Sequence, residues 1–290
     1  MKRILLSVSL MGFALAGVYA VNATGAFFSD TETSTGNTFT AGALDLTVDS
    51  TQHYNGRTCA LVVSSEASSS YLWTGEGTFP SGPCDGTWTL TDLENGVQKF
   101  FNFADVKPGD EGENTVSLHI NNNDAWACVD VNVTDNDDNG LTEPESAVDV
   151  TGGAGEGELA QNINFAAWLD QGATPGFQGS QDVGEGDNIW QGSASEPLLF
   201  SNQSGPASDV LGGKTYTLAA PPLPPLPGGG NPNYIGLAWC AGTQAIVGNN
   251  ITCDGSTLVN IVQTDSFKAS VAFRVEQARN NPNFSCTQEH

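Results

Sequence analysis

The acidic segment Asp135–Ser146, with the sequence DNDDNGLTEPES, combines residue types and spacing that suit a bound cation. Asp135, Asp137 and Asn139 occupy the first, third and fifth positions of an EF-hand-type calcium loop. Gly140 occupies the sixth position, where such a loop turns sharply. Carboxylate and amide oxygens crowded on a turn are hard ligands, which calcium prefers.

The second half of this segment departs from the EF-hand pattern. Leu141 would offer its backbone carbonyl at position seven, and Glu143 stands at position nine. Position twelve holds Ser146 where an EF-hand has a bidentate glutamate, and Glu145 comes one place early. No helix obviously precedes the loop. We therefore predict a calcium loop inside a β protein rather than an EF-hand, with a solvated acidic loop as the alternative.

A second acidic group flanks the apolar run Asn162–Leu169. It begins at Asp170 and continues further along the chain with Asp182, Glu185, Asp187 and Asn188. Asp170 and Asp187 are predicted to complete the first calcium site or to form another one. A calcium ion would hold the long Gly-rich loops of this region together and neutralise carboxylates that otherwise repel each other.

Histidine is too scarce for the common zinc-peptidase pattern. The chain has only His53, His119 and His290, with no HExxH motif and no neighbouring histidine pair. It also lacks the GxSxG motif of a serine hydrolase. Pairs of carboxylates occur in any acidic protein and so identify no glycosidase. The residues predict no catalytic site, although a zinc site of scattered ligands stays open.

Residues 1–26 have the three parts of an export signal: a positively charged start, the apolar run Ile4–Val21 and small residues after it. Cleavage can follow Ala23 or Ala26. An uncleaved membrane anchor is the alternative, because the apolar run is close to spanning length. Cleavage predicts a secreted chain.

Acidity is the main bulk property of the chain. Removing Lys2 and Arg3 with the signal changes the formal net charge from -24 to -26. Such a surface repels nucleic acid and anionic lipid and attracts divalent cations. An acidic surface that only keeps the protein soluble is the alternative interpretation.

Six cysteines in an exported chain indicate disulfides rather than a redox or zinc site. The sequence contains no CxxC motif and no cluster of cysteine with histidine. We predict that Cys59 pairs with Cys84. The sequence leaves open how the other four pair near the C-terminal strands: Cys128, Cys240, Cys253 and Cys286.

Apolar and polar residues alternate with the period of a β-strand in many short runs. Thirty-four glycines and fourteen prolines, with little helical periodicity, indicate many turns between them. We predict an all-β fold, a jelly-roll-like antiparallel sandwich with long Gly/Asp-rich loop insertions. Residues 27–290 would form one sandwich domain, with insertions at about 50–90 and 135–230.

Two stretches carry a family resemblance. The first is FFSD followed by a polar spacer and NTFTAGALDLTVD, over residues 27–49, and the second is the strand–VKPGD–strand arrangement within residues 100–133. Both resemble the TasA/camelysin family of secreted matrix-fibre proteins that a SipW-type signal peptidase processes. The resemblance implies the jelly-roll fold and favours cleavage after Ala26. It extends loosely to residues 235–284, and the two insertions depart from it.

The leading functional hypothesis is a structural subunit of an extracellular fibre, a biofilm matrix or a cell-surface filament. The aromatic residues Phe27, Phe28 and Phe39 lie in a Thr-rich segment at the start of the mature chain. We expect this segment to act as a donor strand that pairs with an open sheet edge of the next subunit. Its partners would be copies of itself or related subunits, and a signal peptidase would process it.

Other functions remain open from the sequence. The camelysin branch of the family is labelled as a metallopeptidase, so a secreted, zinc-dependent peptidase is one alternative. A calcium-dependent surface adhesin is another. The N-terminal segment could also form an edge strand of its own domain without any assembly.

Overall fold

The computed structural model describes residues 44–65, 68–200 and 204–287. All of them belong to one compact unit, Ala43–His290. The predicted signal and the predicted donor-strand residues Phe27, Phe28 and Phe39 lie outside the described residues, so these remain predictions. Within the described part, no helix is long and apolar enough to cross a membrane.

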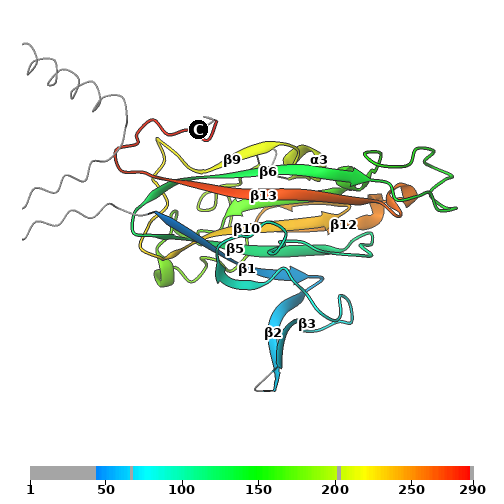
Figure 1. Cartoon of the computed structure of the whole chain (residues 1–290), viewed down its shortest axis with the longest axis horizontal. Coiled ribbons are helices and arrows are strands. Elements are labelled where there is room, and N and C mark those ends of the chain that lie inside the picture. The colour runs from blue at the N-terminus through cyan, green and yellow to red at the C-terminus, as the bar shows by residue number, and fades with distance from the viewer. Residues whose placement is uncertain (1–43, 66–67, 201–203, 288–290) are drawn as a thin grey trace, which may run out of the picture. The chain divides into compact units, whose positions relative to one another are not determined.

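The largest sheet is antiparallel and has the strand order β3-β2-β1-β5-β10-β7-β8, with β4 also pairing with β1 (Figure 1). Its long central strands β1, β5 and β10 pair over most of their length. The strands of this sheet are β1 (Asp45–Tyr54), β2 (Arg57–Ser65), β3 (Ser68–Thr74), β4 (Trp88–Thr91), β5 (Glu111–Asn121), β7 (Ile163–Leu169), β8 (Gly205–Pro206) and β10 (Pro232–Ala241).

A second antiparallel sheet, in the order β13-β6-β9, forms the other layer of a sandwich (Figure 1). Apolar side chains of both sheets, among them Val48, Leu118 and Val129, fill one core between the layers. The all-β sandwich prediction is therefore confirmed, whereas the jelly-roll connectivity stays a prediction. The strands of the second sheet are β6 (Ala125–Asp137), β9 (Lys214–Ala219) and β13 (Ser266–Gln277).

Strand β5 shows how the sequence pattern builds the layers. Its apolar residues Val116, Leu118 and Ile120 belong to the core. The residues between them, including Ser117 and His119, line a cavity on the opposite face of the sheet. Successive side chains of a strand point to opposite faces, so one strand carries both a core and a polar surface.

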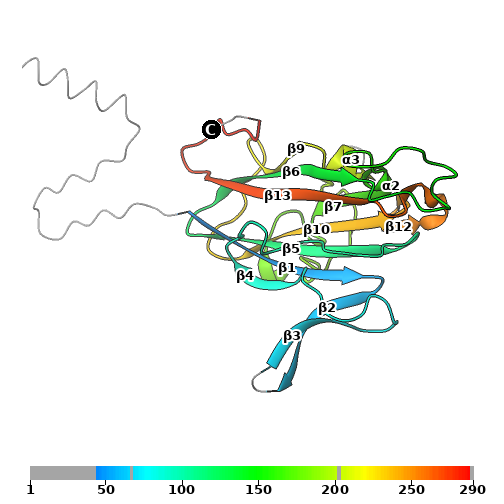
Figure 2. The same ribbon diagram turned by 45° about the vertical axis from the view of Figure 1, so that its right-hand side comes forward.

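The hairpin β2–β3 extends away from the sandwich (Figure 2). The turn Asn55–Gly56 connects β1 to β2, and both of its residues have positive φ, as a tight two-residue turn requires. A disulfide between Cys59 and Cys84 fixes the base of the β2–β3 hairpin, as predicted. Tyr54 contacts the ring of Trp73 at this base.

Two further disulfides complete the pairing that the sequence left open. Cys128 of β6 bonds Cys286, so the disulfide holds the C-terminal segment against β6, and both cysteines are buried. The ring of Phe284 stacks on Trp126 there. Cys240 bonds Cys253 and joins β10 to the small hairpin β11 (Thr243–Val247) and β12 (Asn250–Asp254).

The chain after β7 covers the outer face of the large sheet. Trp168 of β7, Ala238 of β10 and Trp190 of this segment form a second, smaller apolar cluster. Segments that the sequence suggested to be a loop insertion therefore form part of the folded interior. The short helices are α2 (Leu159–Asn162), α3 (Ala207–Val210), and the 3-10 turns η1 (Gly179–Gln181), η2 (Gly255–Thr257) and η3 (Asn260–Val262).

Candidate metal centre

Three acidic side chains from distant parts of the chain meet at one end of the β6–β13 pair. Asp138 directly follows β6, Asp265 directly precedes β13, and Glu145 lies in the turns between β6 and α2. One oxygen from each carboxylate lies within 4.8 Å of one from each of the others. Oxygens that share a calcium ion at about 2.4 Å are at most about 4.8 Å apart, so this spacing suits one ion.

Backbone amides orient these three carboxylates. The Gly140 amide donates to Asp138 Oδ1 at 2.7 Å, and the Thr142 amide donates to Glu145 Oε2 at 3.0 Å. Asp265 Oδ2 accepts from two amides, those of Glu158 at 2.7 Å and Leu159 at 3.0 Å. In each carboxylate the other oxygen is buried without a hydrogen-bond partner. Buried polar oxygens normally have a hydrogen-bond partner, so these three oxygens are available to coordinate an ion.

Two more carboxylates join this group. Asp149 Oδ1 accepts hydrogen bonds from the backbone amide and the hydroxyl of Thr151, at 2.9 and 2.8 Å. Its Oδ2, and Oε2 of Glu158, are again buried without a partner. We refer to the following set as the five-carboxylate centre: Asp138, Glu145, Asp149, Glu158 and Asp265.

The electrostatics of the centre show that its charges act on one another. Burial, followed by the neighbouring carboxylates, raises the pKa of Glu158 to about 6. Burial and the charge of Asp138 also raise the pKa of Asp265, against the hydrogen bonds that it accepts. Among the described residues, every ion pair involves other acids. No basic side chain therefore neutralises the centre within the described structure.

Calcium fits this donor set better than the other common metals. Calcium takes six to eight oxygen ligands. Asp138, Glu145 and Asp265 each bring one oxygen within reach of a common ion, and Asp149 and Glu158 add negative charge nearby. Zinc prefers histidine and cysteine, which the centre lacks, and magnesium keeps several waters rather than an all-protein cage. Gly152 leaves the space open, since a Cβ there would lie 3.2 Å from Asp138 Oδ2.

The residues expected from the EF-hand pattern lie elsewhere, apart from Glu145. Asp135 forms an exposed ion pair with Lys268, 3.0 Å between Nζ and Oδ2. Oδ1 of Asp137 accepts a hydrogen bond from the Gly155 amide at 2.9 Å. The structure thus directs these two acids away from the centre. It brings in Asp138 instead, which does not occupy a ligand position of the EF-hand pattern.

The remaining expected ligands of that segment are also directed elsewhere. The side-chain amide of Asn139 donates to the Thr264 carbonyl at 2.8 Å and to the Ser266 hydroxyl at 2.9 Å. Leu141 and Glu143 are exposed. The sequence-based ligand set and the geometric one therefore share only Glu145.

Asp170 and Asp187 belong to a different place. Asp170 directly follows β7, whereas the five-carboxylate centre lies beside α2, directly before β7. Seven residues of strand separate the two ends by roughly 20 Å, so one ion cannot bridge them. Of the two alternatives for the second acidic group, only a separate site fits the structure.

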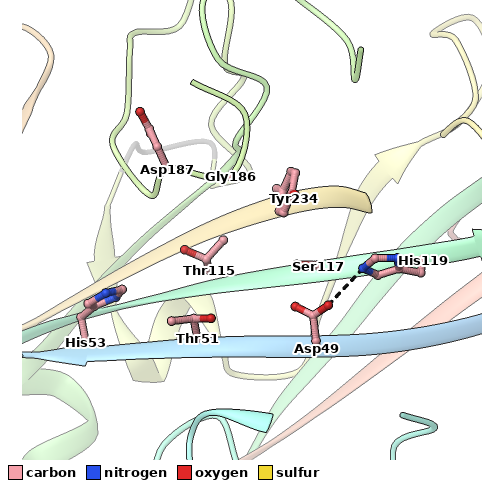
Figure 3. Close-up of a pocket in the computed structure, with 9 residues that line it drawn as sticks. All are labelled: Asp49, Thr51, His53, Thr115, Ser117, His119, Gly186, Asp187 and Tyr234. Atoms are coloured by element: carbon pink, nitrogen blue, oxygen red, sulfur yellow. Dashed lines mark hydrogen bonds and ion pairs between the residues drawn. The ribbon is translucent and has the colours of Figure 1, made fainter. Parts of the chain in front are cut away.

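A polar cavity of about 350 Å³ lies on the outer face of β1 and β5 (Figure 3). His119 contacts Asp49 there, 3.0 Å between Nε2 and Oδ2, and its Nδ1 lies 3.1 Å from the Gly230 carbonyl oxygen. His53 lies at the far end of the row of labelled residues. The strand register places the two histidines about six residues apart, roughly 20 Å, so they cannot share a zinc ion.

Comparison with known proteins adds no family. No family model matches the chain, and no curated protein matches it.

Proposed function

We propose that the chain is a secreted structural subunit of an extracellular fibre, that it assembles by strand addition, and that bound calcium stabilises it. The observation that carries the proposal is the free edge of β13. Within the described residues, β13 pairs with β6 on one side and with no strand on the other. A long unpaired edge is a template for a strand from another chain.

The side chains of β13 support such an addition. Phe267, Val271 and Phe273 are half-buried, although they pack against the core. A donor strand beside β13 would cover their exposed parts and complete the layer. The segment from Phe27 to Phe39 of the next subunit has the aromatic and β-branched residues that fit this role.

The five-carboxylate centre is adjacent to this acceptor strand. Asp265 precedes the first residue of β13, and Asp138 follows the last residue of β6, which pairs with it. A calcium ion here would fix the end of the β6–β13 pair and hold the turns between β6 and α2. Calcium is thus proposed to keep the acceptor edge in a form that can bind the donor strand.

Export is part of the same proposal. Three disulfides and no free cysteine among the described residues are typical of an oxidising compartment. One heterologous contact repeated head to tail gives an open filament. Assembly would then follow removal of the signal, outside the cell or at its surface.

Negative-stain electron microscopy of the mature chain, with calcium or with chelator, tests this function. We expect filaments from the chain starting at Phe27, and none after replacement of Phe27, Phe28 and Phe39 by serine. The matched control replaces Thr31 and Thr33 by serine and should still polymerise.

The acceptor side needs its own pair of variants. Val271→Asp places a charge among the half-buried residues of β13 and should abolish filaments. Ala272→Asp places the same charge on the exposed, opposite face of the strand and should not. Monodisperse particles from the unmodified chain under every condition would contradict the proposal and favour the adhesin or peptidase alternatives, which glycan binding and chelator-sensitive proteolysis would separate.

A further inference from the structure

Two fully buried carboxylates, Asp170 and Glu196, lie together beneath the segment that covers the outer face of the large sheet. Each has a relative exposure of 0%. Their charges influence each other, since Glu196 is among the groups that raise the pKa of Asp170. A buried carboxylate is costly unless a hydrogen bond, an opposite charge or a metal compensates it.

Backbone amides compensate most of these oxygens but not all. Asp170 Oδ2 accepts a hydrogen bond from the amide of Asn188 at 2.8 Å. Glu196 accepts one at Oε1 from the Gly172 amide at 2.9 Å and one at Oε2 from the Gln191 amide. Asp170 Oδ1 is buried without a donor, and a side-chain hydrogen bond links Asp170 to Glu196 when Asp170 carries a proton, which raises the pKa of Asp170 and lowers that of Glu196.

Asn188 adds an independent, uncharged oxygen to this place. Its side chain is 4% exposed, and its amide nitrogen donates to Glu113 Oε2 at 3.0 Å. That hydrogen bond leaves Oδ1 of Asn188, which is also buried without a partner. Amide oxygens are ligands that hard cations accept, and the backbone N–H of the same residue already bonds Asp170.

The surroundings contain negative charge and no described counter-charge. Burial is the main cause that raises the pKa of both carboxyl groups, and the negative charge of Asp187 raises it further. Glu113 is a further acid here; its residue is exposed, although partial burial of its carboxyl group and the charge of Glu111 raise its pKa. None of the ion pairs among the described residues involves these groups.

We propose that Asp170, Asn188 and Glu196 bind a second hard divalent cation, calcium, independently of the five-carboxylate centre and of fibre assembly. The ion would tie the end of β7 to the covering segment, which also contributes Gly186 and Asp187 to the cavity of Figure 3. Calcium at this site would therefore hold both the outer cluster around Trp168 and one wall of that cavity. The competing explanation is a proton shared between the two carboxyl groups.

Terbium, a luminescent substitute for calcium, can report on this site selectively. The indole of Trp190 donates to the Glu196 carbonyl at 3.1 Å, so an ion held by these residues lies close to a tryptophan that can sensitise its emission. We expect the chelated, mature chain to show tryptophan-sensitised terbium emission that added calcium displaces. Trp190→Phe should dim the emission while calorimetry still counts the same number of bound calcium ions.

Variants at the ligands then identify the site. Glu196→Gln should weaken terbium binding at least about tenfold, the loss that even an outer partner of a metal ligand can produce. Asn188→Gly keeps the positive backbone φ of 59° available, removes Oδ1 and should also weaken binding. Asp92→Asn, at an exposed acid, is the matched charge control and should change nothing.

The outcomes separate this proposal from the fibre proposal. Asp138→Asn with Glu145→Gln should remove one calcium ion and leave the tryptophan-sensitised signal. Emission that Glu196→Gln does not weaken would overturn the second site, whatever the filaments do. A second result would also overturn it: Glu196→Gln leaves the number of bound calcium ions unchanged in a folded chain, and its effect on the free energy of unfolding varies only with pH. That result would assign the pair a shared proton.

Discussion

The five-carboxylate centre and the Asp170–Glu196 pair lie at opposite ends of β7 and hold negative charge in different ways. In the first, each of four carboxylates has one oxygen fixed by backbone amides and the other left unpartnered. In the second, amides satisfy both oxygens of Glu196, and the indole N–H of Trp190 donates to the backbone carbonyl of Glu196. The first centre is built mainly of repelling charges, and the second mainly of buried hydrogen bonds.

This difference matters for what a cation does in each place. At the five-carboxylate centre, an ion removes repulsion among neighbouring carboxylates. At the Asp170–Glu196 pair, where Asp170 keeps a proton up to a pKa of about 8, an ion replaces that proton and the solvation that burial removed. Removing the ions should therefore destabilise the protein at both ends of β7, for different physical reasons.

Removing calcium from the wild-type chain should have the largest effect. A ligand at 100 times its dissociation constant stabilises the folded state by about 2.7 kcal/mol per site. Two sites would thus contribute about 5 kcal/mol, which is about 10 to 20 °C in a domain of this size. Differential scanning calorimetry with calcium and with chelator measures it. Equal transition temperatures in both would refute calcium stabilisation.

Isosteric amide variants should distinguish the two places in the metal-free state. Glu145→Gln removes one of five mutually repelling charges and should leave stability in chelator unchanged or raised. Glu196→Gln puts an NH₂ group against a backbone N–H and should cost about 1 to 3 kcal/mol there. Urea unfolding in chelator measures the free energy of unfolding of both variants. An equal loss in the two variants would contradict the proposed difference between the two sites.

The pH dependence of the metal-free chain should be unusual for an acidic protein. The pKa of Glu158 is raised to about 6 and that of Asp170 to about 8, mainly by burial. Groups with a raised folded pKa bind protons more tightly in the folded state, so their contribution is greatest at low pH. Stability in chelator should fall as pH rises from about 4 to about 8, and saturating calcium should abolish the fall. Denaturant midpoints at several pH values test this sign.

The smallest effect should come from the residue that opens the EF-hand-like pattern. Asp135→Asn changes an exposed carboxylate whose described partner is Lys268, so calcium binding should not change measurably. Asp138→Asn, three residues on, should weaken binding strongly. Calorimetric titration of both variants decides between the sequence-based and the geometric ligand sets.

Strand periodicity predicted much of the sandwich, because each strand buries one face. Turn chemistry is local too: at Lys107–Asp110, Gly109 has a φ of 86° and Asp110 donates its backbone N–H to the Lys107 carbonyl, which the Pro-Gly pair favours. The pair Cys59–Cys84 was predicted correctly as well. Local patterns were sufficient where the structure depends on neighbouring residues.

The candidate centre could not be read in the same way. Asp138 and Asp265 meet because β6 and β13 pair antiparallel, and no local pattern reveals that pairing. The acidic run at the end of β6 divides: Asp135 turns to Lys268, whereas Asp138 enters the centre. The signal available in the sequence was the presence of acidic residues at the ends of two strands that could be expected to pair.

The most direct test of the account is X-ray diffraction from crystals of the mature chain grown with calcium. An anomalous difference map locates calcium without assumptions about its ligands. We predict one peak among Asp138, Glu145 and Asp265, and a second beside Asp170 and Glu196. Occupied peaks at other acids with none at the first centre would contradict the proposal that calcium fixes the end of the β6–β13 pair.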